Sequence, residues 1–523
     1  MTQARAILIG LMALCLVAYA VQFFIEFSSG NLAAASIVLA SSLTVLLYVL
    51  WTSAIQTHPL STFALFGFCF TTQLGALLVQ SASWNSLTAN LRQPLETFLI
   101  LALYQGVALL AHALYRLLSN PSSQRASGLI RSVLEKSNLY VTPTAGTLWI
   151  MGLVGLISFL FSGGQGVVGK TAQGFSFLAW APFLIPMFVF QYGDAYCSTK
   201  KNYFFLALYI GAIFLLGIAI NARGMMLSGF MTISLFFLLR AMRSTTRVSA
   251  AQVTKLSVFA LLLVALSIPV ADLATAMVLA RKYRENASTM KLVEETVYYF
   301  QQPQMLLAQR ERDKFVSLQS NYDEAYFASP LLARLIETKF HDNALHFSTR
   351  IPLQDRDRLK EITGDFLWST LPEPVLRGLK IDVEKKDLRF SMGDYISYLG
   401  GGGEVGGFRT GSGFAQGIVI FGHFFPLVYF LVCPILFMAL DLLAYRSVQG
   451  SVFVSSLGML GIWRVFQYGI SGESLQYLFM AVLRGLPQNI VLFLLVFYFA
   501  RMIARMLGTL TRTSRPALTS AAI

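Results

Sequence analysis

Long apolar runs separated by short polar segments dominate this chain of 523 residues. The runs are continuous rather than alternating, which favours helices over strands. Backbone polar groups inside a bilayer must be paired internally, and helices meet that need. Each run is close to the ~20 residues that cross a hydrocarbon core of ~30 Å, so the pattern predicts about twelve membrane-spanning helices. They are expected at residues 7–27, 31–51, 61–79, 95–117, 147–161, 175–190, 203–220, 225–239, 258–277, 421–443, 451–470 and 489–506.

Polar segments of three kinds interrupt this pattern. The stretch 281–410 is long enough for a small domain; 291–340 is predicted to be helical, whereas the remainder holds three prolines and is predicted to be loop-like. A short glycine-rich segment covers 162–174, and 472–487 has apolar residues at helical spacing, typical of an amphipathic helix on a membrane surface. The expected organisation is a transmembrane bundle at 1–280, an outer loop domain at 281–410, and further transmembrane helices with a basic tail at 411–523.

The placement of charge gives the orientation. The stretch 281–410 holds 19 acidic and 19 basic residues, so the rest of the chain carries the whole net charge of +14. Sixteen of the remaining 21 basic residues fall on alternate loops, which is the positive-inside pattern of a polytopic membrane protein. Both chain ends are therefore expected inside and 281–410 outside. Orientation explains these basic residues, so no nucleic-acid partner is expected.

Five basic residues fall outside the orientation pattern: Arg92, Lys170, Arg223, Arg464 and Arg484. Arg92 is interpreted as structural. Arg223 is the sharpest of the five, because it lies between two apolar helices joined by almost no loop. A charge at that depth costs several kcal/mol unless it has a partner or reaches water, and a guanidinium grips phosphate with paired donors. The alternative is a side chain that snorkels to the interface, which the positive-inside bias disfavours on the outer face.

Other cations have two interpretations each. Arg464 lies within its predicted helix, where such residues usually face a bundle interior or a wet cavity; the alternative is a buried ion pair with Glu473 or Asp272. Lys170 and Arg484 are predicted near the outer interface, where ligand binding and snorkelling explain them equally well.

The stretch 400–413 contains eight glycines together with Glu404 and Arg409. Its backbone N–H groups could wrap an anion, and the alternative is a flexible hinge. A nucleotide site is not expected, because the Gly-Lys-Ser/Thr ending and the strand–helix frame are missing. Arg350 is a further outer guanidinium among apolar neighbours. His423, at the outer start of a helix, is either a proton acceptor or an interfacial ring.

The sequence predicts no metal site and no cofactor. His341, His346 and Asp342 have a spacing that fits one helical face, but no dense ligand set follows them, and zinc sites need three or four ligands.

Two short motifs carry a resemblance to a known family. A small-Arg-Gly sequence, Asn221-Ala222-Arg223-Gly224, opens a helix after an outer turn, and a large outer loop leads to Gly411-Ser412-Gly413-Phe414 and then Phe421-Gly422. In these features the chain resembles the bacterial polysaccharide polymerases of the O-antigen polymerase (Wzy) type and the related O-antigen ligases. The architecture matches over nearly the whole chain. The chain departs from the family at Ala415-Gln416-Gly417, where an acidic residue and a tyrosine often precede the Phe-Gly.

The resemblance implies an all-α, GT-C-like fold in a bacterial inner membrane and a glycosyltransferase that joins undecaprenyl-pyrophosphate-linked repeat units at the outer face. It also implies a chain-length-regulating membrane protein as a partner. Arg223 would hold the pyrophosphate. The residues expected to assist are all predicted on the outer side: Arg464, Arg409, Arg350, Lys170 and Arg484 for catalysis or substrate binding, and His423 or a carboxylate such as Glu404 for the proton of the acceptor hydroxyl. The alternatives are a ligase, a flippase of lipid-linked oligosaccharides, and a non-enzymatic assembly scaffold.

Overall fold

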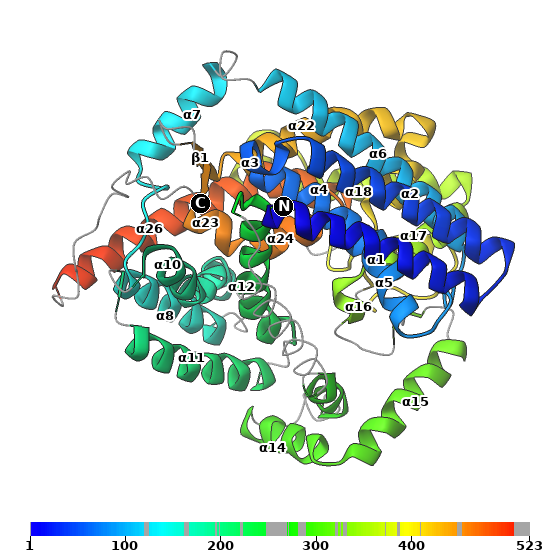
Figure 1. The fold of residues 1–523 in the computed structure, drawn as a ribbon, viewed down its shortest axis with the longest axis horizontal. Helices are drawn as coiled ribbons and strands as arrows, with labels where there is room; N and C mark the ends of the chain where they lie inside the picture. The colour runs from blue at the N-terminus through cyan, green and yellow to red at the C-terminus, as the bar shows by residue number, and fades with distance from the viewer. Residues whose placement is uncertain are drawn as a thin grey trace.

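The computed structural model of the protein describes residues 2–119, 125–161, 167–193, 196–197, 199–219, 223–246, 269, 271–280, 289–319, 323–324, 326–327, 332–371, 373–383, 388–407, 409–446 and 452–506. Helices make up most of this part of the chain (Figure 1). The first half contains α1 (Gln3–Ile25), α2 (Ser29–Trp51), α3 (Ala54–Thr57), α4 (Pro59–Cys69), the π-helical turn η1 (Phe70–Leu74), α5 (Gly75–Ala82), α6 (Pro94–Leu118), α7 (Arg125–Lys136), α8 (Ala145–Phe161), α9 (Val167–Gln173), the 3₁₀ helix η2 (Ser176–Leu184), α10 (Ile185–Tyr192), α11 (Thr199–Ala219) and α12 (Arg223–Arg243).

The second half begins with the predicted outer segment and ends with the last apolar helices. The outer segment contains α14 (Thr289–Phe300), α15 (Pro303–Gln319), α16 (Leu332–Leu335), α17 (Thr338–Thr349), α18 (Leu353–Trp368), α19 (Glu373–Gly378) and α20 (Met392–Leu399). It is followed by α21 (Gly413–Phe421), η5 (Gly422–Phe424), α22 (Phe425–Asp441), β1 (Ala444–Arg446), β2 (Val452–Val454), α23 (Ser456–Leu460), α24 (Ile462–Tyr468), α25 (Leu475–Met480), the π-helical turn η6 (Ala481–Gly485) and α26 (Leu486–Met506). The strands β1 and β2 pair antiparallel, with Tyr445 opposite Phe453.

Nine helical segments in the described part of the chain are long and apolar enough to cross a membrane: Gln3–Ile25, Ser29–Trp51, Pro59–Ala82, Pro94–Leu118, Thr171–Tyr192, Lys200–Ala219, Gly224–Arg243, Gly413–Asp441 and Leu475–Met506. Two shorter apolar helices, Ala145–Phe161 and Ala271–Ala280, accompany them. The chain is therefore a mainly helical, multi-pass membrane protein. Most of the predicted span 258–277 lies outside the described residues, so the number of about twelve stays a prediction.

Three predicted segments differ from the structure. The span predicted at 451–470 is instead β2 followed by the short helices α23 and α24, which meet at Gly461. The surface helix predicted at 472–487 continues through η6 into α26, and these residues form one apolar helical segment, Leu475–Met506. The later part of 281–410, predicted to be loop-like, contains α18, α19 and α20.

The prolines explain the last of these differences. Pro352 is the N-cap residue of α18 and Pro374 lies in the first turn of α19. Proline is tolerated in the first helical turn, because the N–H that it lacks would have no partner there. These prolines mark where helices begin, and not where helical structure is absent.

The centre of the bundle is the α4 helix, whose residues are all buried. It packs against α24 so closely that a Cβ atom on Gly67 would lie 1.9 Å from the Phe466 carbonyl oxygen. Small residues allow such close approach of helix backbones in membranes. Gly67 therefore determines how closely α24 lies against α4.

Although α17 belongs to the predicted outer segment, most of its residues are buried, and it packs against η1, α6, α20 and α21. The N–H of Glu337, just before the helix, donates to the Thr71 carbonyl at 2.7 Å, and the Thr338 hydroxyl donates to the Thr72 carbonyl at 2.8 Å. Both carbonyls belong to the π-helical turn η1, where the irregular helix accommodates outside partners. By contrast, α14 and α15 lie at the edge of the molecule (Figure 1).

The Asp342 carboxylate attaches α17 to the start of α6. It accepts the backbone N–H groups of Arg92 at 2.8 Å and Gln93 at 3.0 Å, and the Thr97 hydroxyl at 3.1 Å. A carboxylate at a helix N-terminus satisfies N–H groups that have no partner within the helix. Lys339 lies 3.5 Å from Asp342, so this buried charge is both hydrogen-bonded and paired.

Candidate functional site

A narrow crevice, too tight in this structure to hold a water molecule, marks the place where α17 begins, where α24 ends, and where the glycine-rich stretch reaches α21. Its lining combines two carboxylates, a histidine and a tyrosine with apolar and backbone groups: Glu337, Phe340, His341, Thr410, Gly411, Tyr468, Ser471, Gly472 and Glu473. These residues come from three distant parts of the sequence. The crevice therefore exists only in the folded protein, and it is our candidate functional site.

Glycines allow two walls of the crevice to meet. The Gly413 N–H donates to the Gly472 carbonyl at 3.0 Å. A Cβ atom on Gly411 would lie 2.6 Å from the Glu473 carbonyl oxygen and 2.9 Å from the Gly393 nitrogen. At this end of the glycine-rich stretch, the need for glycine comes from close backbone contact.

Glu337 is the central carboxylate of the crevice, with only 3% of its surface exposed. The Gln467 side-chain amide donates to Glu337 Oε1 at 2.9 Å, and Tyr468 also hydrogen-bonds to this carboxylate. Burial raises the pKa of Glu337 to about 8, and the charge of Glu473 adds to the rise. The hydrogen bonds from Tyr468 and Gln467 and the charge of Arg334 act in the opposite direction. Glu337 therefore holds a proton near neutral pH.

Glu473 is the second carboxylate and shares Tyr468 as a hydrogen-bond partner. The Glu473 side chain is exposed at the edge of the crevice. The protein atoms around its carboxylate still remove enough water to raise its pKa, while the Tyr468 hydrogen bond and the charges of Arg334 and Arg464 lower it. Two nearby carboxylates repel each other when both are charged, so the protonation of one depends on the other. Glu337 and Glu473 thus form a carboxylate pair linked by one tyrosine.

His341 has an unused polar atom at this site. The ring is 2% exposed, and its Nδ1 atom lies 2.8 Å from the Ser412 hydroxyl. Its Nε2 atom is buried and has no hydrogen-bond partner among the described residues. Burial lowers the pKa of His341 to about 4, so the ring is neutral at pH 7. A neutral ring can donate or accept one hydrogen bond from a ligand, depending on its tautomer.

Among the predicted site residues whose side chains the structure describes, Arg464 is the one whose charge acts on this pair. It is exposed on α24, and its charge lowers the pKa of Glu473. The described residues contain no ion pair between Arg464 and either predicted partner, Glu473 or Asp272. Asp272 pairs instead with Arg310, at 2.5 Å.

Arg409 and Arg350 lie close to the crevice in sequence. The Arg409 guanidinium donates to the Ser397 hydroxyl at 2.7 Å, and its backbone N–H donates to Asp394 at 3.2 Å. Arg409 therefore braces the glycine-rich stretch next to Thr410, which lines the crevice. Arg350 is exposed at the end of α17.

Three other predicted residues, His423, Glu404 and Arg484, stand apart from the crevice lining. His423 is exposed in η5, and Glu404 is exposed in the glycine-rich stretch. Arg484 is exposed in η6 and donates to the Thr370 carbonyl at 3.2 Å. Lys170 lies in α9, and its side chain is outside the described part of the structure.

Arg223 is the first residue of α12. Its side chain also lies outside the described part of the structure, so only the position of its backbone bears on the site. The helix that it begins packs against α24, which carries Arg464 and Tyr468.

No family model, curated protein or solved structure matches this chain. The function must therefore be inferred from the chemistry of the crevice and from the resemblance of the motifs.

Sequence reasoning missed the residues at the centre of the site. Glu337 did not stand out, because 281–410 contains many charged residues. It does, however, directly follow the stretch 331–336, which is apolar except for Arg334. Glu473 was considered only as an ion-pair partner, although it is one of seven acidic residues outside 281–410. Two signals in the sequence were available. Glu337 lies next to an apolar run, and Glu473 lies in a part of the chain where acidic residues are rare.

A second buried polar network lies between α4, α6 and α22. Asp441 accepts the Ser61 hydroxyl at 2.6 Å, and that hydroxyl lies 3.0 Å from His112 Nε2. His112 Nδ1 contacts the Tyr48 hydroxyl at 2.8 Å. In a catalytic triad the carboxylate orients the histidine, whereas here it binds the serine. The network has a partner for each of these groups and, with Tyr48 of α2, holds four helices together.

Proposed function

We propose that this protein is a glycosyltransferase that joins undecaprenyl-pyrophosphate-linked oligosaccharide repeat units into a polysaccharide at the outer face of a bacterial inner membrane. The observation that supports this best is the carboxylate pair Glu337 and Glu473, which lies in a crevice of a multi-pass membrane protein beside the charges of Arg334 and Arg464. Such a site combines a proton acceptor with fixed cations, and glycosyl transfer from a lipid pyrophosphate needs both. The sequence motifs at Arg223 and 411–422 support the same assignment.

The reaction needs one proton acceptor. The acceptor hydroxyl oxygen attacks the anomeric carbon of the donor, the bond from that carbon to the pyrophosphate oxygen breaks, and the pyrophosphate leaves with the electron pair. In the proposal, the charged form of Glu337 takes the hydroxyl proton. Its raised pKa of about 8 makes it a stronger base than an ordinary glutamate. His341 is placed to orient the hydroxyl or the sugar through its unused Nε2 atom.

Negative charge grows on the leaving pyrophosphate, and fixed cations stabilise that charge. The charges of Arg334 and Arg464, which lie far apart in the sequence, both lower the pKa of Glu473. Both arginine side chains are exposed. Both arginines keep their positive charge at physiological pH, because a guanidinium is not deprotonated there. They can therefore stabilise the leaving pyrophosphate throughout the reaction. Arg223 joins this group in the proposal because of the resemblance, since it lies in the small-Arg-Gly motif Asn221-Ala222-Arg223-Gly224.

The rival proposal is a proton-coupled flippase of the same lipid-linked oligosaccharide. Buried carboxylates within membrane proteins commonly carry protons during transport, and Glu337 fits that role too. The two functions differ in the face of the membrane on which the lipid-linked repeat unit accumulates when the protein fails.

The experiment that separates them is an analysis of lipid-linked oligosaccharides in cells that carry Glu337→Gln. A polymerase defect leaves single repeat units exposed on the outer face, with no polymer. A flippase defect leaves the repeat units on the inner face. Glu361→Gln is the matched control, because Glu361 is an exposed glutamate on α18. Full-length polymer from Glu337→Gln would reject the assignment.

Arg223 is tested in the same cells. Arg223→Ala is expected to abolish polymer while the protein level holds, and Arg223→Lys is expected not to restore it, because lysine lacks the paired donors of a guanidinium. Normal polymer from Arg223→Ala would remove Arg223 from the site without removing Glu337.

A further inference from the structure

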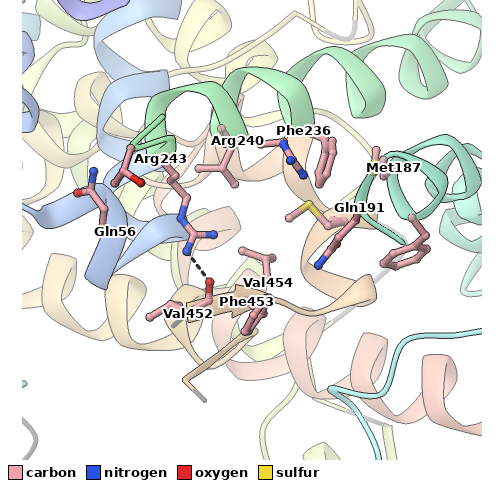
Figure 2. A pocket seen from close by; sticks show the side chains of 13 residues that line it. Gln56, Met187, Gln191, Phe236, Arg240, Arg243, Val452, Phe453 and Val454 are labelled. Atoms are coloured by element: carbon pink, nitrogen blue, oxygen red, sulfur yellow. Dashed lines mark hydrogen bonds between the residues drawn. The ribbon is translucent and has the colours of Figure 1, made fainter. Parts of the chain in front are cut away.

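A cavity of about 230 Å³ lies at the opposite end of α12 from Arg223. Its walls mix apolar side chains with a few polar ones: Gln56, Met187, Phe188, Gln191, Phe236, Leu239, Arg240, Arg243, Thr245, Val452, Phe453, Val454 and Met459. Figure 2 shows Arg240 and Arg243 reaching down from α12, with Gln56 on one side and Met187 and Gln191 on the other. We call this the basic cavity.

The two arginines of the basic cavity lie three residues apart on α12, so they share one face of the helix. The Arg243 guanidinium donates to the Val452 carbonyl of β2 (Figure 2). The Arg240 guanidinium lies over the Phe190 ring, 4.3 Å from its centre. Within the described residues, neither arginine has an ion pair with a carboxylate.

Two buried polar atoms on the cavity residues have no hydrogen-bond partner among the described residues. One is Arg243 Nε and the other is Gln56 Oε1. Leaving a buried polar group without a partner is unfavourable, and more so for a charged group. Arg243 Nε is a donor and Gln56 Oε1 is an acceptor, so the unpartnered donor of the cavity belongs to Arg243. The cavity therefore offers N–H groups to an acceptor that is negatively charged.

A simpler explanation accounts for only part of this arrangement. Arginines in the last turn of a helix interact favourably with its dipole, and basic residues gather on the inner side of membrane proteins. Those effects explain why Arg240 and Arg243 are present. They do not explain why two like charges line one cavity in which Arg243 Nε has no hydrogen-bond partner among the described residues.

We infer that the basic cavity binds the phosphate group of an anionic phospholipid from the leaflet on the basic side of the protein. Arg243, Arg240 and Gln56 would donate to the phosphodiester oxygens, as basic pockets between membrane helices do for lipid head groups. Phe188, Phe236 and the other apolar wall residues would contact the first carbons of the acyl chains. This inference does not depend on the proposed glycosyltransferase function, since the lipid would bind at the other end of α12.

The test uses the full-length protein in nanodiscs of phosphatidylcholine that contain a minor fraction of phosphatidylglycerol, with native mass spectrometry of the lipid retained on the protein. The wild-type protein is expected to retain phosphatidylglycerol in preference to phosphatidylcholine. Arg243→Gln is expected to weaken that retention by about tenfold or more, the effect of losing charged hydrogen bonds. The matched control is Arg505→Gln, an exposed arginine near the end of α26.

The outcomes separate the possible ligands. Equal retention of both lipids by the wild-type protein would overturn the inference, whatever the variants do. Equal losses in Arg243→Gln and Arg505→Gln would also overturn it, because the effect would then come from net charge alone. Inorganic phosphate is added in a separate arm: displacement of phosphatidylglycerol by millimolar phosphate would assign the site to free phosphate and reject the lipid. If Arg243→Gln does not fold, Gln56→Leu and the wild-type preference still test the site.

Discussion

The crevice and the basic cavity bury charge in different ways. The crevice holds two carboxylates, and the pKa of Glu337, raised to about 8, lets it lose its charge by binding a proton. The basic cavity holds guanidinium groups, which stay charged at any physiological pH and therefore need an anion or a carbonyl nearby. A buried carboxylate that gains and loses a proton easily is suited to proton transfer. A buried guanidinium that keeps its charge is suited to the binding of an anion. The two sites thus indicate two different tasks within one membrane protein.

The largest expected effect is that of Glu337→Gln on catalysis. Glutamine keeps the shape but cannot take a proton, so the rate of glycosyl transfer is expected to fall by about 10²–10⁴-fold. The measurement is polymer formation by the purified protein with lipid-linked repeat units. An unchanged rate would show that the buried carboxylate is only structural, and the contrast between the two sites would lose its meaning. Retention of phosphatidylglycerol should be unaffected in this variant.

The next effect is on stability, and it comes from Asp342→Asn. The substitution removes the negative charge of Asp342, which caps α6 and pairs with Lys339. Asp342 and Lys339 are both buried. Removing one partner of a buried pair is expected to cost about 3 kcal/mol, which thermal unfolding in detergent would detect. Asp357→Asn is the matched control, because Asp357 also pairs with a lysine three positions away, at 2.8 Å, but on an exposed surface. Equal losses in both variants would contradict the docking role of α17.

A smaller effect concerns pH. Glu337 must be charged to accept a proton, so the rate is expected to rise with pH as its proton is lost around pH 8. The hydrogen bond from Tyr468 lowers the pKa of Glu337. Tyr468→Phe removes that bond, so the pKa should rise and the rising limb of the pH–rate profile should move to higher pH. A limb that stays in place, or moves to lower pH, would show that another group limits the rate.

The smallest effect is expected for Arg484→Gln. Arg484 is exposed and makes one hydrogen bond, to the Thr370 carbonyl, and surface substitutions of this kind usually change stability by less than about 0.5 kcal/mol. Polymer formation should also remain normal, because Arg484 does not line the crevice. A strong loss of polymer would extend the active site to η6 and reopen the choice among the outer cations.

Hydropathy predicted the helical, multi-pass architecture because the bilayer demands one solution, a continuous apolar helix, for every span. It could not predict α23 and α24, since the apolar run 451–470 carries no signal for the break at Gly461 other than the glycine itself. The position of α17 was equally inaccessible. Its attachment depends on Asp342 meeting the backbone of Arg92 and Gln93, a contact between residues about 250 positions apart.

The candidate site was predicted only in part for the same reason. Arg464 stood out because a charge within an apolar run is rare. Glu337 did not, because it lies in a segment rich in charges, where most are ordinary solvated groups. What distinguishes Glu337 is its burial against Gln467 and Tyr468, and burial in this protein comes from the packing of distant segments.

The attachment of α17 to η1 and α6 also limits how this protein can be re-engineered. A chimera that exchanged the whole of 281–410 for a foreign segment would lose the Glu337–Thr71 and Asp342–Gln93 hydrogen bonds together with the loop. The safer graft exchanges only α14 and α15, at the edge of the molecule, and leaves α17 in its native place. Whatever property α14 and α15 carry can then be exchanged while the contacts of α17 with the bundle stay intact.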